Sequence, residues 1–211
     1  MTLSKRLFDL ALLALLFPLL GTILAAILLY MLIRRQRPFF YVSERMKTPD
    51  QPFMLIKLRT MTPDSTDSGV TGADKAGRIT RLGRFLRKSR LDELPQMINI
   101  LKGDISFVGP RPPLRSYVER FPEIYGQVLI SRPGVTGMAS LFYHAHEEYL
   151  LAQCKTPQET DATYARACVP RKAQLDLIYQ ARWSICMDIW LIAKTTQKIL
   201  LRRPQKPWLP R

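Results

Sequence analysis

The dominant pattern in the chain is a nearly continuous run of apolar residues from Leu7 to Ile33. The run contains one acidic residue, Asp9, and it exceeds the roughly 20 residues that a helix needs to cross a bilayer. Its length, and the lack of a small-residue cleavage site near Ile33, argue against a removable signal peptide. The pattern therefore predicts a helix that lies in a membrane.

Basic residues flank both ends of this run, with two before it and three after it: Lys5, Arg6, Arg34, Arg35 and Arg37. Lys and Arg prefer the cytoplasmic side of a membrane, and a straight span would place only one end there. Pro18, near the middle, lacks an amide donor and clashes with the preceding turn, so it favours a kink. A re-entrant helix with both ends in the cytoplasm and a kinked span both remain open.

Two short β-prone runs follow, at residues 39–42 and 53–56, and polar residues with two prolines separate them. They predict a small β-hairpin. Lys57 and Arg59 continue the second run and alternate, which points both cations to one side. They could contact phosphate or lipid headgroups, or they could face solvent. Residues 63–77 are rich in Ser, Thr, Asp and Gly and predict a mobile loop.

Further along the chain, an amphipathic helix is predicted at residues 78–90, and helices are also predicted at residues 94–101, 162–180 and 183–201. The first has an apolar stripe of Ile79, Leu82, Phe85 and Leu86, and it is suited to an anionic membrane surface. In the last helix, core packing is slightly favoured over membrane contact for the apolar positions. We therefore expect an α+β, membrane-associated fold with residues 1–37 as a re-entrant membrane helix, 38–203 as a domain at the cytoplasmic face and 204–211 as a basic tail.

The charge balance points to anionic partners. The 211 residues include 32 Lys and Arg against 17 Asp and Glu, a formal net charge of +15. Nucleic acid, anionic membrane lipids and phosphorylated substrates all fit this balance. No nucleic-acid motif accompanies the basic segments, and the membrane helix favours lipid, so we expect no nucleic acid among the partners. Three widely spaced cysteines and two histidines support neither a disulfide framework nor a zinc site.

Candidate chemistry begins at Asp92 and Glu93, adjacent acids that follow a segment with five arginines and two lysines at residues 75–90. Nearby cations would hold both carboxylates as anions, as a nucleophile or metal ligand requires. A structural alternative is stronger on local pattern alone. Ser89 and Asp92 have the spacing of a helix capping box, and an acid in a first helical turn is stabilised by the helix dipole.

Arg111 is the second candidate, because it lies within the proline-rich segment Gly109-Pro110-Arg111-Pro112-Pro113. Prolines fix an extended backbone and would hold this side chain in a defined place. A pre-positioned guanidinium suits a bidentate phosphate contact. A rigid linker with an incidental arginine is an equal alternative at this stage.

Several motifs occur in a characteristic order: Lys57-Leu58-Arg59-Thr60-Met61, Arg90-Leu91-Asp92-Glu93-Leu94-Pro95-Gln96, Val108-Gly109-Pro110-Arg111-Pro112 and Arg132-Pro133-Gly134-Val135-Thr136-Gly137. Together they resemble the monotopic phosphoglycosyl transferases, also called the bacterial sugar transferase family. The resemblance covers nearly the whole chain. The chain is similar to the small form of the family, which has only a catalytic domain.

The resemblance implies an enzyme that transfers a sugar phosphate from a nucleoside diphosphate sugar, usually a UDP-sugar, to a polyprenol phosphate such as undecaprenyl phosphate. It implies Asp92 as a nucleophile that forms a covalent phosphosugar intermediate, and Glu93, with Asp92, as a ligand of Mg2+ or a proton carrier. It implies a supporting part for Asp176. It also implies substrate and phosphate contacts for six residues: Lys57, Arg59, Arg90, Pro110, Arg111 and Pro112. The expected location is the cytoplasmic face of the bacterial inner membrane.

Departures from the family pattern limit what can be carried over. Phe17-Pro18 replaces the usual Ser-Pro at the helix break, the first hairpin lacks the usual glycines, and Met138 to His144 differs from the family's segment, so the donor sugar is not assigned. A homodimer is left open. The alternatives are a membrane-anchored basic scaffold without catalysis, and a hydrolase of UDP-sugars.

Overall fold

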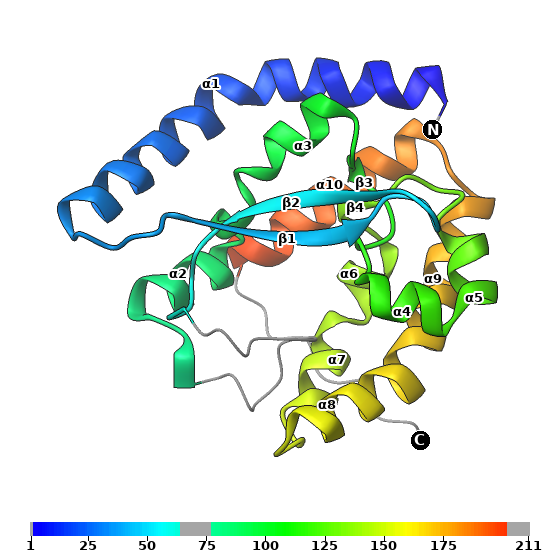
Figure 1. Ribbon diagram of the computed structural model, residues 1–211. Helices are drawn as coiled ribbons and strands as arrows, with labels where there is room; N and C mark the ends of the chain where they lie inside the picture. Colours follow the sequence, from blue (N-terminus) through cyan, green and yellow to red (C-terminus); the bar gives the residue numbers. More distant parts are fainter. Residues whose placement is uncertain (1, 64–76, 202–211) are drawn as a thin grey trace.

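The computed structural model describes residues 2–63 and 77–201, and it has the α+β class expected. Among the described residues, the strands form two separate two-stranded sheets, and helices make up most of the rest (Figure 1). The predicted loop at 63–77 lies almost wholly outside the described residues. The predicted basic tail at 204–211 lies wholly outside them. The elements are α1 (Leu3–Ile33), β1 (Phe40–Met46), β2 (Pro52–Leu58), α2 (Arg81–Ser89), η2 (Leu91–Glu93), α3 (Gln96–Lys102), β3 (Ser106–Val108), α4 (Arg115–Arg120), α5 (Pro122–Val128), β4 (Gly134–Thr136), α6 (Met138–Phe142), α7 (His144–Leu151), α8 (Pro157–Thr163), η3 (Tyr164–Cys168), α9 (Val169–Ala181) and α10 (Ile185–Leu201).

The apolar run forms one helix, α1, which Thr2 caps by accepting a hydrogen bond from the Lys5 amide. The helix continues through Pro18, and Figure 1 shows it bent part-way along its length. Most of its side chains are exposed, although it is long and apolar enough to cross a membrane. Apolar area of this size is unfavourable in water, which supports the predicted association with a membrane.

The N-terminal end of α1 is fixed to the domain by a buried polar cluster of Lys5, Tyr179, Trp183 and Asp188. Lys5 Nζ lies 2.7 Å from Asp188 Oδ2 and donates to Tyr179 OH at 3.0 Å. Tyr179 OH donates to Asp188 Oδ1 (2.7 Å), and Trp183 Nε1 donates to Asp188 Oδ2 (3.2 Å). Both carboxylate oxygens of Asp188 are therefore paired, and Lys5 is joined to three side chains near the other end of the chain in one anchor.

Two further contacts connect α1 to the elements near the acid pair. Asp9, the acid inside the apolar run, is buried and accepts hydrogen bonds from Ser106 Oγ (2.9 Å) and the Phe107 amide (3.2 Å) at β3. Arg6 donates to two carbonyls at the C-terminal end of α3, at 2.6 and 2.7 Å. A cation at a helix C-terminus is favourable, so Arg6 of α1 stabilises α3, the helix that follows the acid pair.

The predicted hairpin is confirmed, and its strands are longer than expected. β1 and β2 are antiparallel, with Tyr41 opposite Lys57 and Arg45 opposite Phe53. Phe53 and Leu55 pack into a cluster with α1 and α3. Residues directly opposite share a face of the sheet, so one face of the hairpin covers both this core and the cleft described below.

A short parallel pair, β3 with β4, was not predicted from the sequence. Ser106 lies opposite Gly134 and Val108 lies opposite Thr136. A Cβ atom at Gly134 would collide with the backbone nitrogen of Gly109, so only glycine permits this close approach. The Gly134 amide also donates to the Pro110 carbonyl at 2.8 Å, which fixes the backbone immediately before Arg111.

Helix α2 begins three residues later than predicted, because Thr80 accepts a hydrogen bond from the Gly83 amide and acts as its N-cap. Leu86 is fully buried, as the apolar stripe predicts. Phe85 belongs to the same apolar stripe, and 54% of its surface is exposed. The buried face of α2 is narrow and consists of Gly83 and Leu86.

The predicted helix at 162–180 is part of a longer helical segment in which α8, the π-helical η3 and α9 follow one another. Together with α4, α5 and α7, these elements enclose a cluster of buried apolar residues that includes Tyr125, Cys168 and Val169. The final predicted helix is α10. The prediction that the apolar positions of this helix pack in the core is wrong for Cys186 and Trp190, because both are exposed. The buried positions of α10 are Asp188 and Leu191.

Candidate active site

The acid pair lies in a tight turn between two helices. Arg90 adopts a left-handed backbone conformation (φ 57°) at the end of α2, and the chain then enters the one-turn helix η2 with Asp92 and Glu93. The capping-box prediction is wrong, because the Ser89 hydroxyl donates back to carbonyls of α2 at 2.9 and 3.2 Å. The turn at Arg90 redirects the chain and buries both acids, which are 7% and 6% exposed.

Glu93 is surrounded by three cations from different parts of the chain. Its Oε1 lies 2.9 Å from Lys57 Nζ, 3.2 Å from Arg111 Nη2 and 3.5 Å from Arg90 Nη1. Burial by itself would raise the pKa of Glu93, but Lys57, then Arg111 and Arg90, hold that pKa well below its usual range. Glu93 is therefore an anion at all physiological pH values, as predicted.

Asp92 differs from its neighbour in both partners and charge. Burial, and then the adjacent Glu93 charge, raise the pKa of Asp92, while Lys57, Arg90 and Arg111 oppose the rise. The expectation that a helix terminus and cations would lower this pKa is wrong in direction, because burial outweighs them. In the part of the chain that the structure describes, Asp92 Oδ1 is buried without a hydrogen-bond partner. No other described protein group therefore engages this oxygen.

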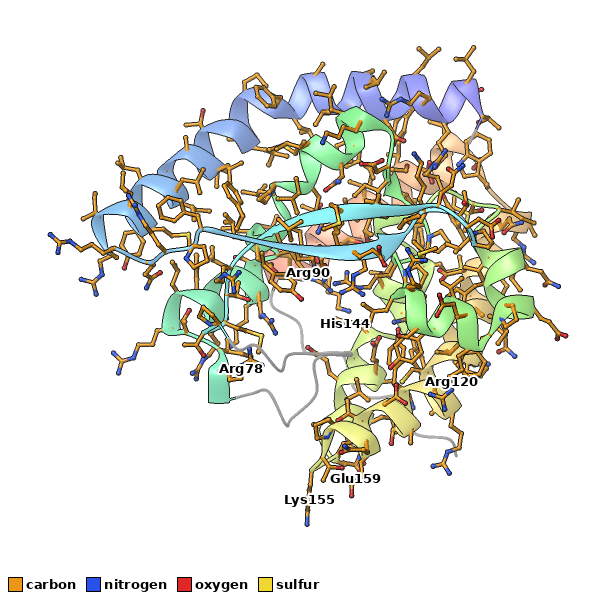
Figure 2. The ribbon with its side chains drawn as sticks, viewed as in Figure 1. Arg78, Arg90, Arg120, His144, Lys155 and Glu159 are labelled. Carbon is orange, nitrogen blue, oxygen red and sulfur yellow. The ribbon has the colours of Figure 1, made fainter. Side chains whose placement is uncertain are left out.

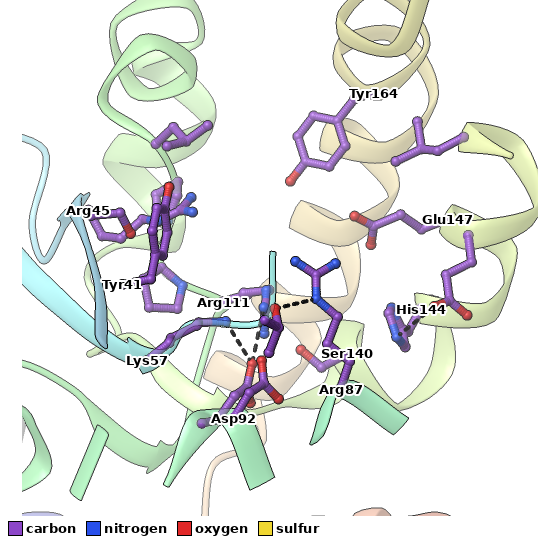
Figure 3. Close-up of a pocket in the computed structure, with 18 of the residues that line it drawn as sticks. Tyr41, Arg45, Lys57, Arg87, Asp92, Arg111, Ser140, His144, Glu147 and Tyr164 are labelled. Carbon is purple, nitrogen blue, oxygen red and sulfur yellow. Dashed lines mark hydrogen bonds and ion pairs between the residues drawn. The ribbon is translucent and has the colours of Figure 1, made fainter. Parts of the chain in front are cut away.

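A cleft of about 1170 Å³ opens over the acid pair, and most of the predicted site residues line it. Figure 3 shows Lys57, Arg111 and Asp92 together at its centre. Arg59 and Pro112 also line it, and Lys57 and Arg59 do lie on one side of the hairpin, as their alternation predicts. Pro110 is buried and contributes its carbonyl to Gly134.

Asp176, the supporting residue implied by resemblance, lies on the wall that α9 contributes to this cleft. Its side chain is buried, and its Oδ1 has no hydrogen-bond partner among the described residues. Burial raises the pKa of Asp176 to about 7, although Lys172 opposes the rise. Asp176 is thus a carboxyl group that gains or loses its proton near neutral pH.

Several lining residues were missed by the sequence analysis. On one wall, Tyr41, Ser43 and Arg45 project from β1, and their alternate spacing is a signal that could have identified them. The opposite wall, seen in Figure 3, carries His144 and Glu147 with Tyr164 and Lys172, and Lys172 lies 3.0 Å from Glu147. His144 and Glu147 share α7, but Tyr164 and Lys172 come from η3 and α9, so no single local pattern joins the four residues.

His144 belongs to α7 and faces the same basic region as Arg90, which lies near it in the view of Figure 2. Burial, and then the charges of Arg90 and Arg111, lower the pKa of His144 to about 3. The imidazole is therefore neutral at pH 7. It adds a hydrogen-bonding group to the cleft without adding to the charge.

A divalent cation would depend on few protein ligands here. The described residues contain no group of three or more His, Cys, Asp or Glu side chains that could hold a metal ion. Asp92 Oδ1 lacks a partner, and the three cations of Glu93 all contact Oε1. Carboxylate oxygens are suitable ligands for Mg2+, which usually binds one or two carboxylates and completes its shell with water and substrate phosphates. The donor set at the acid pair fits that preference.

The fold and the cleft together define a class of protein: an α+β domain that carries one helix long and apolar enough to cross a membrane, with an acid pair and surrounding cations that suit phosphoryl transfer. Residues 1–202 match the family described as bacterial sugar transferase, and the chain therefore belongs to that family. The prediction that it is a transferase enzyme is confirmed at this level.

Similar proteins come from several bacteria. The "Uncharacterized sugar transferase EpsL" of Bacillus subtilis is 31% identical over 93% of this chain and 87% of its own length. A UDP-glucose:undecaprenyl-phosphate glucose-1-phosphate transferase of Caulobacter vibrioides is 31% identical, over 94% of this chain and 70% of its own length. A UDP-N-acetylgalactosamine-undecaprenyl-phosphate N-acetylgalactosaminephosphotransferase of Aeromonas hydrophila is 30% identical, and the match covers 93% of this chain but only 43% of that protein.

Proposed function

We propose that this protein transfers a sugar phosphate from a UDP-sugar to undecaprenyl phosphate or a similar polyprenol phosphate. The products are a polyprenol diphosphate sugar and UMP, and the reaction initiates the synthesis of a bacterial glycoconjugate. The activities named for the relatives from Caulobacter and Aeromonas support these substrate classes. The observation that carries the proposal is the partnerless Oδ1 of Asp92 beside Glu93, whose three cations line the same cleft.

In the first step, an ionised Asp92 oxygen attacks the β-phosphorus of the donor. A bond forms between that oxygen and phosphorus, the bond from phosphorus to the bridging diphosphate oxygen breaks, and UMP leaves with the electron pair. The aspartyl phosphosugar remains on the enzyme. Lys57 and Arg111 offset the charge that develops on the phosphoryl oxygens, since both lie at the acid pair.

In the second step, a phosphate oxygen of the polyprenol phosphate attacks the same phosphorus. The bond between phosphorus and the Asp92 oxygen breaks, the carboxylate is regenerated, and the lipid diphosphate sugar is released. Glu93 stays ionised through both steps because three cations hold it. Its part is to fix Lys57, Arg90 and Arg111 around the reacting phosphate.

Asp92 and Glu93 would hold Mg2+ through their carboxylate oxygens, and the ion when bound would neutralise charge on the donor diphosphate. The arginines and Lys57 remain necessary beside it, because a nucleoside diphosphate and a lipid phosphate together bring several negative charges into one cleft. Removing divalent cations with a chelator should lower the rate of UMP release, and added Mg2+ should restore it.

The proposed location is the cytoplasmic face of the inner membrane, with α1 as a re-entrant helix. The internal Pro18, the bend in α1 and the basic residues at both of its ends support this arrangement. Exposed arginines on α2 would contact anionic lipids. Single cysteines at Ser4 and Arg37 should react with a membrane-impermeant reagent from the same side, and reaction from opposite sides would establish a span instead.

The reaction is tested with the full chain in nanodiscs that contain polyprenol phosphate, using a panel of labelled UDP-sugars. Lipid-linked sugar and UMP should appear in equal amounts. Free sugar phosphate formed without lipid acceptor would establish a hydrolase, and binding of lipid and donor without turnover across the panel would establish a scaffold. Either of these two results would contradict the transferase.

A further inference from the structure

The inner face of strand β1 presents three different side chains to the cleft. Tyr41, Ser43 and Arg45 occupy alternate positions, so they point to one side of the hairpin, and all three line the cleft. Tyr41 lies opposite Lys57 in the register, so this is the face from which Lys57 reaches Glu93. Figure 3 shows Tyr41 and Arg45 on one side of Asp92 and His144 and Tyr164 on the other.

Arg45 is a half-buried cation without a partner in residues 2–63 and 77–201. Its Nε is fully buried and makes no hydrogen bond there, and its guanidinium forms no ion pair with the described acids. Arg111 lines the same small hollow beside it, so a second positive charge is close. Burying an unpaired charge costs free energy, so a group of this kind is expected to have a ligand as its partner.

The two other side chains of this face complete an ordered set. Ser43 Oγ is buried and also has no hydrogen-bond partner within the described ranges. Tyr41 is 38% exposed, and Arg59 lies 5.7 Å from the centre of its ring. An aromatic ring, a hydroxyl and a guanidinium therefore follow one another over about 13 Å of strand. This order matches the base, ribose and phosphate of a nucleotide, for which stacking, hydrogen bonding and charge pairing are the respective contacts.

We propose that the inner face of β1 holds the nucleoside monophosphate half of the donor, with Arg45 on the phosphate that leaves, Ser43 on the ribose and Tyr41 against the base. This inference rests on the proposed function, since it divides the cleft of that reaction into parts. The position of Arg45 beside Arg111 supports it, because Arg111 contacts Glu93 at the place where the adjacent phosphate would be attacked.

The test compares UMP with uridine on the full chain in nanodiscs, with uridine measured by competition. Arg45→Gln should weaken UMP binding about tenfold or more, which is the loss expected for one charge-assisted hydrogen bond, and should leave uridine binding within twofold. Tyr41→Leu should weaken both ligands by the same factor, because both carry the base. Tyr41→Phe should retain both affinities.

Arg115→Gln is the matched control. Arg115 belongs to α4, and its Nε lies 2.7 Å from Oε1 of Glu44, which points from the opposite face of β1. This variant should leave UMP affinity unchanged. Thermal stability separates binding from folding: Arg45→Gln removes an unpaired buried charge, so its melting temperature should equal or exceed that of the unaltered protein. A clear fall in melting temperature together with the loss of UMP binding would assign Arg45 a structural part and overturn the proposal.

Three other results would also overturn it: unchanged UMP affinity in Arg45→Gln, an equal loss of UMP and uridine affinity in that variant, or a loss confined to the step that uses polyprenol phosphate. The last result would place the acceptor phosphate at Arg45. The two proposals fail separately. The expected UMP and uridine pattern without any sugar transfer would preserve the nucleotide subsite and reject the transferase, whereas transfer with UMP binding that ignores Arg45 would do the reverse.

Discussion

Two buried polar clusters in this molecule differ in how completely their groups are paired. In the anchor of α1, Asp188 accepts hydrogen bonds at both oxygens and Lys5 contacts both Asp188 and Tyr179. In the cleft, Asp92 Oδ1 and Arg45 Nε are buried without partners among the described residues. Nearly all buried polar groups in folded proteins are satisfied, so two unpaired groups that line one cleft, one an acid and one a cation, indicate a place for a ligand. The completely paired cluster at α1 has an architectural part instead.

The largest effect on stability should come from breaking the anchor. Asp188→Asn leaves the Lys5 charge buried without its carboxylate, and removing one partner of a buried pair costs about 3–5 kcal/mol. Denaturant unfolding in detergent micelles measures this loss. Glu44→Gln is the control, because its ion pair with Arg115 is about half exposed and should contribute about 0–1 kcal/mol. Equal losses in the two variants would contradict the distinction between the clusters.

Asp176, in the cleft, should make the free energy of unfolding depend on pH. Its pKa of about 7 lies above the ordinary 3.8, so between these values the folded protein binds a proton that the unfolded chain releases. Its contribution to the free energy of unfolding therefore falls as pH rises from about 4 to 7, by roughly 4 kcal/mol at most. Asp176→Asn should flatten this decline in thermal melts between pH 5 and 8. Asp50→Asn, in the exposed hairpin turn, should not, and an unchanged slope in Asp176→Asn would refute the assignment.

A smaller effect is expected in the pH dependence of the reaction. Asp92 must be ionised to attack, and because its pKa is raised, kcat/KM for UMP release should rise with pH above the usual carboxyl range. Lys57 opposes that rise in pKa, so Lys57→Met should move the acid limb upward by about one pH unit. Lys57→Arg keeps the charge and should keep the limb in place. A lower rate with an unmoved limb would show that Lys57 acts on the substrate alone.

The sequence predicted the elements with strong local patterns and missed the contacts that join them. The apolar run of α1, the two runs of the hairpin and the shared side of Lys57 and Arg59 follow from periodicity. The cage around Glu93 does not, because Lys57 and Arg111 lie 36 and 18 residues away along the chain. Ser89 and Asp92 have the spacing of a capping box, but the left-handed backbone conformation of Arg90 prevents the box from forming.

Strands β3 and β4 were missed for a related reason. Each has three residues, which is too short for an alternating pattern, and their pairing depends on the close approach of Gly109 and Gly134. Arg111 was identified through its neighbouring prolines, yet its position depends on this pair. The raised pKa of Asp92 was likewise beyond reach, since it reflects burial by elements distant in sequence.

The most direct test of the central claim uses a UDP-sugar labelled at the β-phosphate, with Mg2+ and no lipid acceptor. The account predicts that the label becomes bound to the peptide that contains Asp92, that UMP is released in equal amount, and that added polyprenol phosphate then removes the label. Asp92→Asn should fold with unreduced thermal stability and take up no label. Label that persists in Asp92→Asn, or lipid product formed by that variant at the normal rate, would contradict the account.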